Sequence, residues 1–418
     1  MTLTTTTPTP EFSRARTGTL AVVMFCYLFY YTGRQTFGFA IPLISKELHL
    51  SLTELGFCST IMLWCYALGQ AINGQLADRF GGKRMMVAGA ILSFGLCVTV
   101  SFAHGLAGLL IPWALNGLAQ SMGWAPGAWI LSNWWGREHR GRVFGWYTFA
   151  AGSSSVVAYG MSDFVAPHGW RWLFRLPVSL LLVGGIVFWL VVKERPSDAG
   201  FENLAEDTPD GVPNSSNLDD GQQLSATDRY ARALKCLPFL IGCLSIGFQN
   251  LARYALLVWV PVHILGSPLE SASSPWVALG LPIGMAVGAV SAGWLSDRVF
   301  KGRRSTAIIL FLFAASAFSL AMYRLQPGSW WLLPLLFMTG FFVYGPQSGY
   351  WALCPELLGT RLAGTGTGIM NFFAYLFAGV GETLVGHLTD LTHSTSTVFL
   401  VVCVACAAGA SLMIFVRR

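Results

Sequence analysis

The chain has 418 residues, of which 54% are apolar and only 11% charged, and its formal net charge is +6. A soluble domain carries about 25% charged residues, so this composition excludes a soluble globular protein and indicates a polytopic membrane protein. The nine cysteines fall almost entirely in apolar segments and show no metal-ligand spacing beside histidine. They predict neither a disulfide framework nor a metal site.

The chain begins with a polar, threonine-rich segment, and we expect residues 1–18 to form a disordered cytoplasmic tail. Six apolar segments follow, at 20–43, 54–78, 84–104, 108–134, 139–164 and 172–193. A second set of six lies at 236–264, 273–297, 305–323, 330–353, 362–389 and 396–415. Each is long enough to cross a hydrocarbon core of about 30 Å. The sequence therefore predicts an all-α membrane protein of twelve transmembrane helices, in two six-helix bundles at 19–193 and 233–418.

The segment between the two sets has a different composition. Residues 194–228 contain nine acidic residues and one arginine, and they are rich in proline, serine, asparagine and glycine. Such a segment cannot bury a core of its own. We therefore predict that residues 194–232 form an acidic, flexible cytoplasmic linker, and a binding or regulatory role for it stays open.

Basic residues predict the orientation of the chain in the membrane. With the N-terminus inside, the loops on the cytoplasmic side hold Arg79, Lys83, Arg84, Arg137, Arg140, Arg142, Arg298, Lys301, Arg303, Arg304 and Arg361. The outer loops hold few, mainly Lys46, Arg171 and Arg324. This positive-inside bias predicts a multi-pass protein of a bacterial plasma membrane with both termini in the cytoplasm.

Two unrelated features repeat at one interval along the chain. Arg34 and Arg253 each lie inside a long apolar segment and are 219 residues apart, and the same interval separates Asp78 from Asp297. The repeat indicates a duplicated half with a buried arginine at the equivalent place in each copy. A charged residue at mid-bilayer costs about 2.5–3.5 kcal/mol on insertion scales. We interpret the pair as a binding site for an anion, with the two arginines facing each other across the symmetry axis.

The second repeated feature is a glycine, an aspartate and a basic run at a predicted cytoplasmic loop. It reads GQLADRFGGKR after the second span and GWLSDRVFKGRR after the eighth. A charge network at this edge that changes with conformation is what an alternating-access carrier needs. The pattern resembles the cytoplasmic-loop signature of the major facilitator superfamily, and its candidate gating residues are Gly74, Asp78, Arg79, Gly293, Asp297 and Arg298.

Longer segments narrow the resemblance. The chain is similar to the organophosphate:phosphate antiporter family in five segments, which read YYTGRQTFGFAIPLI, NGLAQSMGWAPGAWI, LARYALLVWVPVHIL, YGPQSGYWALCPE and AGTGTGIMNFFAYLFAG. That resemblance implies exchange of phosphorylated metabolites for inorganic phosphate, with Arg34 and Arg253 on the two family arginines that hold the phosphoryl group. Guanidinium offers a permanently charged, planar donor fork that suits phosphate. The chain departs from the family at Gln70, where a lysine is common, and at Ala150, where the glycerol-3-phosphate branch has a histidine.

Polar and aromatic residues near the two arginines are candidates for a cavity lining. Tyr30 and Tyr31 lie four and three positions before Arg34, which places them on its helix face, and Gln249 and Asn250 precede Arg253 in the same way. Further candidates near mid-span are Gln70, Trp124, Tyr254, Tyr344, Asn371 and Tyr375. Any one of them could serve helix packing instead, but as a set around two buried arginines they predict a substrate cavity.

Glu382 is a mid-span acid that the family resemblance does not explain. Buried carboxylates often mark proton paths or pair with an arginine. If Glu382 reached Arg34 or Arg253 in the empty carrier, it would compete with the substrate anion, and its protonation would free the arginine. A proton-coupled symporter of a carboxylate or phosphonate is therefore the nearest rival hypothesis.

The remaining expectations follow from what the sequence lacks. No Walker-type loop, nucleophile elbow or HExxH sequence occurs, which argues against ATP as an energy source and against an enzyme. A transporter-like sugar-phosphate receptor is a third hypothesis, disfavoured by the lack of a long extra cytoplasmic domain. We expect no cofactor, no metal and no nucleic-acid partner. The expected partners are a small anionic substrate, phosphate or protons and the lipid bilayer, and the expected state is a monomer.

Overall fold

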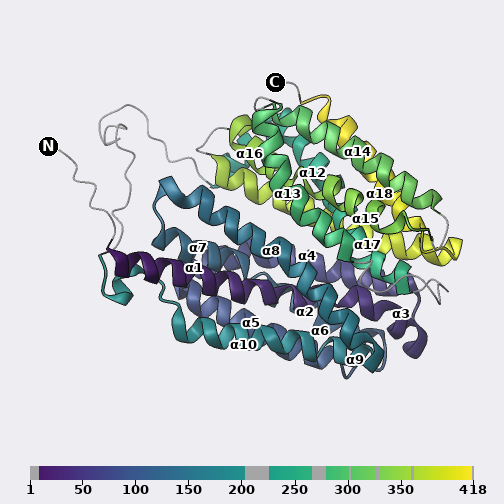
Figure 1. Cartoon of the computed structure of the whole chain (residues 1–418), viewed down its shortest axis with the longest axis horizontal. Helices are drawn as coiled ribbons and strands as arrows, with labels where there is room; N and C mark the ends of the chain where they lie inside the picture. The colour runs from purple at the N-terminus through teal and green to yellow at the C-terminus, as the bar shows by residue number, and fades with distance from the viewer. Residues whose placement is uncertain are drawn as a thin grey trace.

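The computed structural model describes residues 9–202, 226–265, 279–300, 303–325, 329–358 and 362–416. All regular structure in these ranges is helical, as the composition predicts. Two groups of helices pack against each other along their length (Figure 1). The lower group holds α1 to α10 and the upper group holds α12 to α18, so each half of the sequence forms one bundle.

The described helices fall on the twelve predicted spans, and several spans are broken. The first helix begins earlier than predicted, at Pro10, because Phe12 in the expected disordered tail packs on Trp134. In the first half they are α1 (Pro10–Tyr30), α2 (Thr32–Gln35), α3 (Phe37–Leu48), α4 (Leu52–Phe80), α5 (Gly82–Val100), α6 (Leu106–Gln120), α7 (Trp124–Trp134), α8 (Arg137–Val165), η1 (Ala166–His168), α9 (Trp170–Leu173) and α10 (Leu176–Val191). In the second half they are α12 (Leu237–Leu265), α13 (Gly280–Arg298), α14 (Arg304–Arg324), α15 (Leu332–Tyr344), α16 (Gln347–Leu358), α17 (Ala363–Thr392) and α18 (Thr397–Met413). Six spans of the described chain are long and apolar enough to cross a membrane, by length and composition alone.

The breaks lie near the middle of the spans, and a proline explains one of them. Span 108–134 is interrupted at Ser121–Gly123, and span 330–353 at Gly345 and Pro346, where proline lacks the backbone N–H that an α-helix needs. The first span is interrupted at Tyr31 and Thr36. Irregular backbone at this depth is tolerated where it is buried in protein or lines a cavity.

Glycines let the helices of each half approach closely. A Cβ atom at Gly288 of α13 would collide with the carbonyl oxygen of Phe341 in α15, and one at Gly117 of α6 would collide with that of Met62 in α4. Helices in lipid gain little from burying apolar surface, so van der Waals contact between small residues holds them together.

Parts of the predicted flexible linker are ordered. Residues Pro196–Ala199 form a short 3-10 helix, η2, and Ala226–Lys235 form α11, while 203–225 lie outside the described residues. The carboxylate of Glu194 accepts a hydrogen bond from the N–H of Lys83 (2.9 Å), and Trp134 donates to the carbonyl of Lys193 (2.9 Å). The start of the linker therefore packs on the first bundle because polar backbone and tryptophan groups there need partners.

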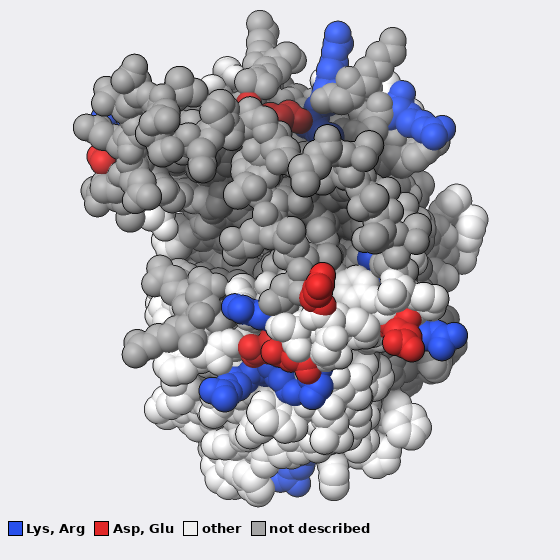
Figure 2. Space-filling model, turned by 90° about the vertical axis from the view of Figure 1, so that its left-hand side faces the viewer, with Lys and Arg blue, Asp and Glu red and all other residues white. Residues whose placement is uncertain are grey.

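Charged side chains gather where this packing occurs. Figure 2 looks onto the left-hand side of Figure 1, where α1 begins, and shows basic and acidic side chains close together on the lower part of that face. At the start of the linker, Glu194 and Asp198 interact electrostatically with Lys83 of the first bundle.

Candidate functional site

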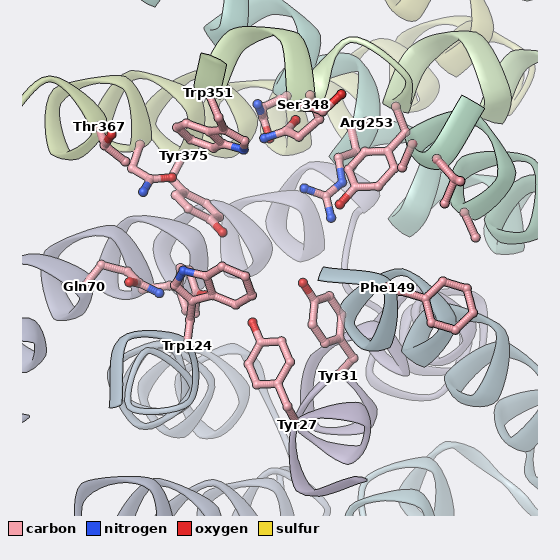
Figure 3. A pocket seen from close by; sticks show the side chains of 18 of the residues that line it. Tyr27, Tyr31, Gln70, Trp124, Phe149, Arg253, Ser348, Trp351, Thr367 and Tyr375 are labelled. Carbon is pink, nitrogen blue, oxygen red and sulfur yellow. The ribbon is translucent and has the colours of Figure 1, made fainter. Parts of the chain in front are cut away.

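A cavity of about 910 Å³ lies between the two halves. Its lining combines aromatic rings with uncharged polar groups around one arginine: Tyr27, Tyr31, Tyr66, Gln70, Trp124, Trp146, Phe149, Asn250, Arg253, Ala286, Ala289, Val290, Tyr344, Gln347, Ser348, Trp351, Thr367, Asn371 and Tyr375. Figure 3 shows Tyr27, Tyr31, Trp124 and Gln70 on one wall, opposite Arg253, Trp351 and Tyr375. Both halves of the chain therefore contribute to one site.

Arg253 projects from α12 into this cavity. Its side chain is only 8% exposed, and its Nε atom has no hydrogen-bond partner. The guanidinium carbon lies 4.3 Å from the ring centre of Tyr344 and 5.1 Å from that of Tyr254, which is the geometry of cation–π contacts. Figure 3 shows the guanidinium facing the hydroxyl of Tyr31 on the opposite wall.

Arg34 is not among the lining residues but contacts two of them. It belongs to the short helix α2 and is 7% exposed, and its Nε and Nη1 atoms have no hydrogen-bond partner. Its guanidinium carbon is 3.9 Å from the ring centre of Tyr31 and 4.9 Å from that of Tyr66. Arg34 thus contacts a lining residue, Tyr31, while Arg253 is itself among the lining residues, and the face-to-face arrangement of the two arginines stays a prediction.

Tyrosine rings connect the two arginines. The ring centres of Tyr66 and Tyr375 are 4.8 Å apart, and those of Tyr375 and Tyr254 are 5.8 Å apart. Since Arg34 lies over Tyr66 and Arg253 over Tyr254, the contacts run without a gap from one half of the chain to the other. The negative faces of these rings stabilise both cations partially but do not neutralise them.

The cavity carries positive charge without a balancing carboxylate. Among the described lining residues no aspartate or glutamate occurs, and the described ion pairs join Arg171 to Glu47 and Arg304 to Glu356 instead. A buried guanidinium without an anion is costly, and an anionic ligand with several acceptor oxygens would satisfy its free N–H groups. The arrangement can therefore bind a small anion.

Eight of the twelve predicted cavity residues line the cavity, and four do not. The eight are Tyr31, Gln70, Trp124, Asn250, Arg253, Tyr344, Asn371 and Tyr375. Besides Arg34, the exceptions are Tyr30, whose hydroxyl donates to the carbonyl of Met86, Gln249, whose amide donates to the carbonyl of Val343 (2.8 Å), and Tyr254, which contacts Arg253 with its ring. Tyr30 and Gln249 serve helix packing because a carbonyl of a neighbouring helix takes their donor.

Several lining residues were not among the predicted set. They are Tyr27, Tyr66, Trp146, Phe149, Gln347, Ser348, Trp351 and Thr367, with three small apolar residues. A signal for two of them exists in the sequence. Tyr27 lies four positions before Tyr31, and Tyr66 four positions before Gln70, so each shares a helix face with a predicted residue.

Glu382 lies away from the cavity and does not pair with either arginine among the described ion pairs. Its Oε2 atom accepts a hydrogen bond from the indole N–H of Trp259 (2.9 Å). The expected competition between Glu382 and the substrate for an arginine is therefore wrong. The sequence position of Glu382 indicated how far along α17 this acid lies. It did not indicate that the carboxyl lies on the side of α17 that faces Trp259.

The two halves of the chain contact each other extensively at the end of the molecule where α4 begins. Residues 52–64 of α4 pack there against residues 376–390 of α17. We call this region the closed end. Asp390 accepts hydrogen bonds from the N–H groups of Leu52 (3.1 Å) and Thr53 (2.7 Å), and Trp64 donates to the carbonyl of Leu376 (3.2 Å). The cavity lies beyond these contacts, and its lining continues to Trp146, which is 51% exposed.

The predicted gating residues lie at the opposite end from these contacts. Gly74, Asp78 and Arg79 belong to the last turns of α4, and Gly293, Asp297 and Arg298 to those of α13. The side chains of Asp78, Arg79 and Asp297 lie outside the described residues, and Arg298 is exposed. Their gating role stays a prediction.

Comparison with known proteins identifies the family. Residues 23–382 match the profile of the Major Facilitator Superfamily. The fold is similar to an inward-facing, unoccupied structure of a bacterial homologue of the human lysosomal transporter Spinster, with a TM-score of 0.73 and 15% identity over 98% of this chain and 95% of that one. The chain therefore belongs to the Major Facilitator Superfamily, a class of membrane transporters, and the expectation that it is not an enzyme is confirmed.

Three relatives indicate which members of the superfamily the chain resembles. The chain is 25% identical over 402 residues to a probable hexose phosphate transport protein of Chlamydia pneumoniae, covering 93% of this chain and 88% of the relative. It is 25% identical to a glycerol-3-phosphate transporter of Haemophilus influenzae, covering 90% and 85%. It is 27% identical to the membrane sensor protein UhpC of Salmonella typhimurium, covering 93% and 88%. These relatives agree with the resemblance to organophosphate:phosphate antiporters.

Proposed function

We propose that this protein is a secondary transporter that exchanges a phosphorylated small metabolite for inorganic phosphate by alternating access. The observation that carries the proposal is the pair of buried arginines whose guanidinium N–H groups lack partners around a cavity without a described carboxylate. Relatives named for the transport of hexose phosphate and glycerol-3-phosphate support the phosphoryl group as the ligand.

Arg253 and Arg34 contribute differently to phosphoryl binding. Arg253 reaches the cavity and donates directly to the phosphoryl oxygens. Arg34 lies 3.9 Å below the ring of Tyr31, so its charge attracts the anion while the Tyr31 hydroxyl faces the cavity. Charge-assisted N–H···O bonds are about twice as strong as neutral ones, so Arg253 contributes most to affinity.

The remainder of the substrate contacts uncharged groups. Gln70, Asn250 and Asn371 offer amide donors and acceptors, and Trp124 and Trp351 offer flat apolar faces. A hydroxylated carbon skeleton can form hydrogen bonds to the amides while its C–H groups pack on the indoles. The cavity therefore suits a phosphate ester with one charged group and a neutral remainder.

The contacts between the halves correspond to one state of the transport cycle. If the positive-inside orientation holds, the closed end faces the outside, and the cavity opens toward the cytoplasm. Exchange then requires the closed end to separate while the ends of α4 and α13, with their Asp78 and Asp297 motifs, come together. Both termini lie in the cytoplasm in this arrangement.

Counterflow in proteoliposomes tests the function. Vesicles containing the purified protein are loaded with unlabelled phosphate, and uptake of external labelled phosphate is followed with and without glucose-6-phosphate or glycerol-3-phosphate as competitor. We expect uptake only in loaded vesicles and inhibition by at least one ester. Uptake that needs a pH gradient instead of internal phosphate would overturn the exchange reading in favour of a proton symporter.

Binding without transport is the third outcome. The 27% identity to a membrane sensor protein over 93% of this chain makes a sensor the second candidate. Phosphate ester binding that stabilises the protein, without counterflow in either direction, would establish that reading and reject transport.

A further inference from the structure

Glu382 is the most completely buried acidic group in the described chain. It lies on α17 at the closed end and is 0% exposed. From the first half of the chain, α4 covers its backbone, because a Cβ atom at Gly56 would lie only 2.5 Å from the carbonyl oxygen of Glu382. Its Oε2 atom accepts one hydrogen bond from Trp259 of α12, and its Oε1 atom has no partner.

The groups that face Glu382 provide no positive charge. From α8, Tyr159 interacts electrostatically with Glu382, and its hydroxyl donates to the carbonyl of Leu257 (2.6 Å). On α17 itself Asp390 accepts hydrogen bonds at the start of α4. On α12, His263 is engaged with the hydroxyl of Thr395 (2.8 Å). No described arginine, lysine or histidine forms an ion pair with the Glu382 carboxyl.

Contacts between the two halves enclose this carboxyl. Tyr159 of the first half bonds to Leu257 of the second, and Thr60 of α4 bonds to the carbonyl of Gly379 on α17, one turn before Glu382. A Cβ atom at Gly38 in α3 would collide with the carbonyl of Val258, beside Trp259. Separation of the halves at this end would break these contacts and admit water to Glu382.

The burial of Glu382 without a neighbouring cation determines its protonation state. An ionised carboxylate with one neutral donor and one unsatisfied oxygen is strongly disfavoured inside protein, whereas the neutral acid needs far less solvation. Once water reaches it, the same group ionises as an ordinary glutamate does.

We propose that Glu382 is a proton-binding site that forms when the closed end closes. On closure a carboxylate oxygen takes one proton from the water on that side, and on opening the carboxylic acid returns it. Acidic solution on that side therefore favours the closed end, and alkaline solution favours its opening. The site is separate from phosphoryl binding and involves neither arginine.

Hydrogen–deuterium exchange of the full chain in lipid nanodiscs tests the proposal. The readout is the opening of peptides covering 52–64 and 376–390 as a function of pH, corrected for intrinsic exchange, without any substrate. Release of one proton on opening predicts that the opening equilibrium rises about tenfold per pH unit. Glu382→Gln should remove this slope, because the amide holds the neutral state at every pH.

Two variants make the result specific. Glu54→Gln removes a partly buried carboxylate near the start of α4, which accepts hydrogen bonds from Ser51, and should keep the wild-type slope. Trp259→Phe removes the single donor to the carboxylate and should extend the slope to higher pH. A flat wild-type profile, or a wild-type slope in Glu382→Gln, would overturn the proposal. If Glu382→Gln did not fold, the comparison of Trp259→Phe with wild type would decide. A slope that continues to higher pH in Trp259→Phe than in wild type would support the proposal, and an unshifted slope would reject it.

Discussion

Arg34 and Arg253 occupy equivalent positions in the two halves but different places at the cavity. Arg253 lies on the wall with its guanidinium among Tyr344 and Tyr254, while Arg34 lies under the ring of Tyr31. A direct donor depends on the planar fork of arginine, whereas a charge acting through an aromatic ring depends mainly on its sign. The two residues should therefore tolerate lysine differently.

Replacing Arg253 by lysine should weaken phosphate binding about tenfold to a hundredfold, the equivalent of one or two charge-assisted hydrogen bonds. Arg34→Lys keeps its charge near Tyr31 and should have a smaller effect. Binding is measured by phosphate titration of the purified protein, and Arg171→Lys, at a partly exposed arginine bonded to Glu47, serves as the control. Equal affinity in Arg253→Lys and wild type would show that Arg253 is structural.

Gln70 is the second residue whose identity affects the ligand. It lines the cavity and is uncharged, while no lysine occurs among the described lining residues. A cation at this position should favour doubly charged anions, since the added attraction scales with ligand charge. We expect Gln70→Lys to increase the preference for phosphate esters over singly charged methylphosphonate esters, and Gln70→Met to leave it unchanged. The measurement is competition against labelled phosphate at fixed pH, and an unaltered preference in Gln70→Lys would place this residue off the substrate path.

At the scale of the element, the closed end depends on a helix terminus. The Asp390 side chain accepts from the Leu52 and Thr53 N–H groups and from the Thr53 hydroxyl (2.6 Å), which are the first donors of α4. The start of an α-helix has unsatisfied N–H groups and a partial positive charge, so a carboxylate there stabilises the contact. This capping residue comes from the other half of the chain, and it therefore stabilises the closed state rather than α4 alone.

Asp390→Asn should loosen the closed end by about 1 kcal/mol, the usual size of a charge–dipole interaction at a helix terminus. The amide still accepts one hydrogen bond but lacks the negative charge. Hydrogen exchange of residues 52–64 should become faster, while exchange in α10, which packs on α1 and α5 of the first bundle, stays constant. Asp198→Asn, which changes the cap of η2, is the control. Unchanged protection in Asp390→Asn would mean that packing alone holds the closed end.

The sequence predicts the helices better than their interruptions. Apolar length identified the spans, but hydropathy does not distinguish a continuous helix from α1, α2 and α3 with breaks at Tyr31 and Thr36. The break at Gly345 and Pro346 in the tenth span was not predicted either, although the proline there is a signal for it, because proline cannot donate within a helix. The break at Tyr31 has no such signal. Helical spacing alone also did not show that the Tyr30 hydroxyl bonds to the carbonyl of Met86.

At the scale of the whole molecule, the interval of 219 residues predicted two similar halves and a shared site between them. It could not predict how the halves differ. Tyr31 covers Arg34, but its counterpart Asn250 leaves Arg253 on the cavity wall. Such differences depend on side-chain size at matched positions and on which end of the molecule is closed, neither of which a repeat interval contains.

Two buried cations of the same sign make the empty protein less stable than its anion-bound form. Each guanidinium is less than 10% exposed and has N–H groups without partners. A ligand that binds only the native state stabilises it by mass action, by about 2.7 kcal/mol at a hundred times its dissociation constant. Phosphate at that concentration should therefore raise the thermal unfolding temperature, which is measured on the purified protein in detergent. Chloride at matched ionic strength should not, because it cannot offer several acceptor oxygens to both arginines. An equal rise with both salts would mean that screening relieves the repulsion between Arg34 and Arg253 and that the cavity does not recognise phosphate.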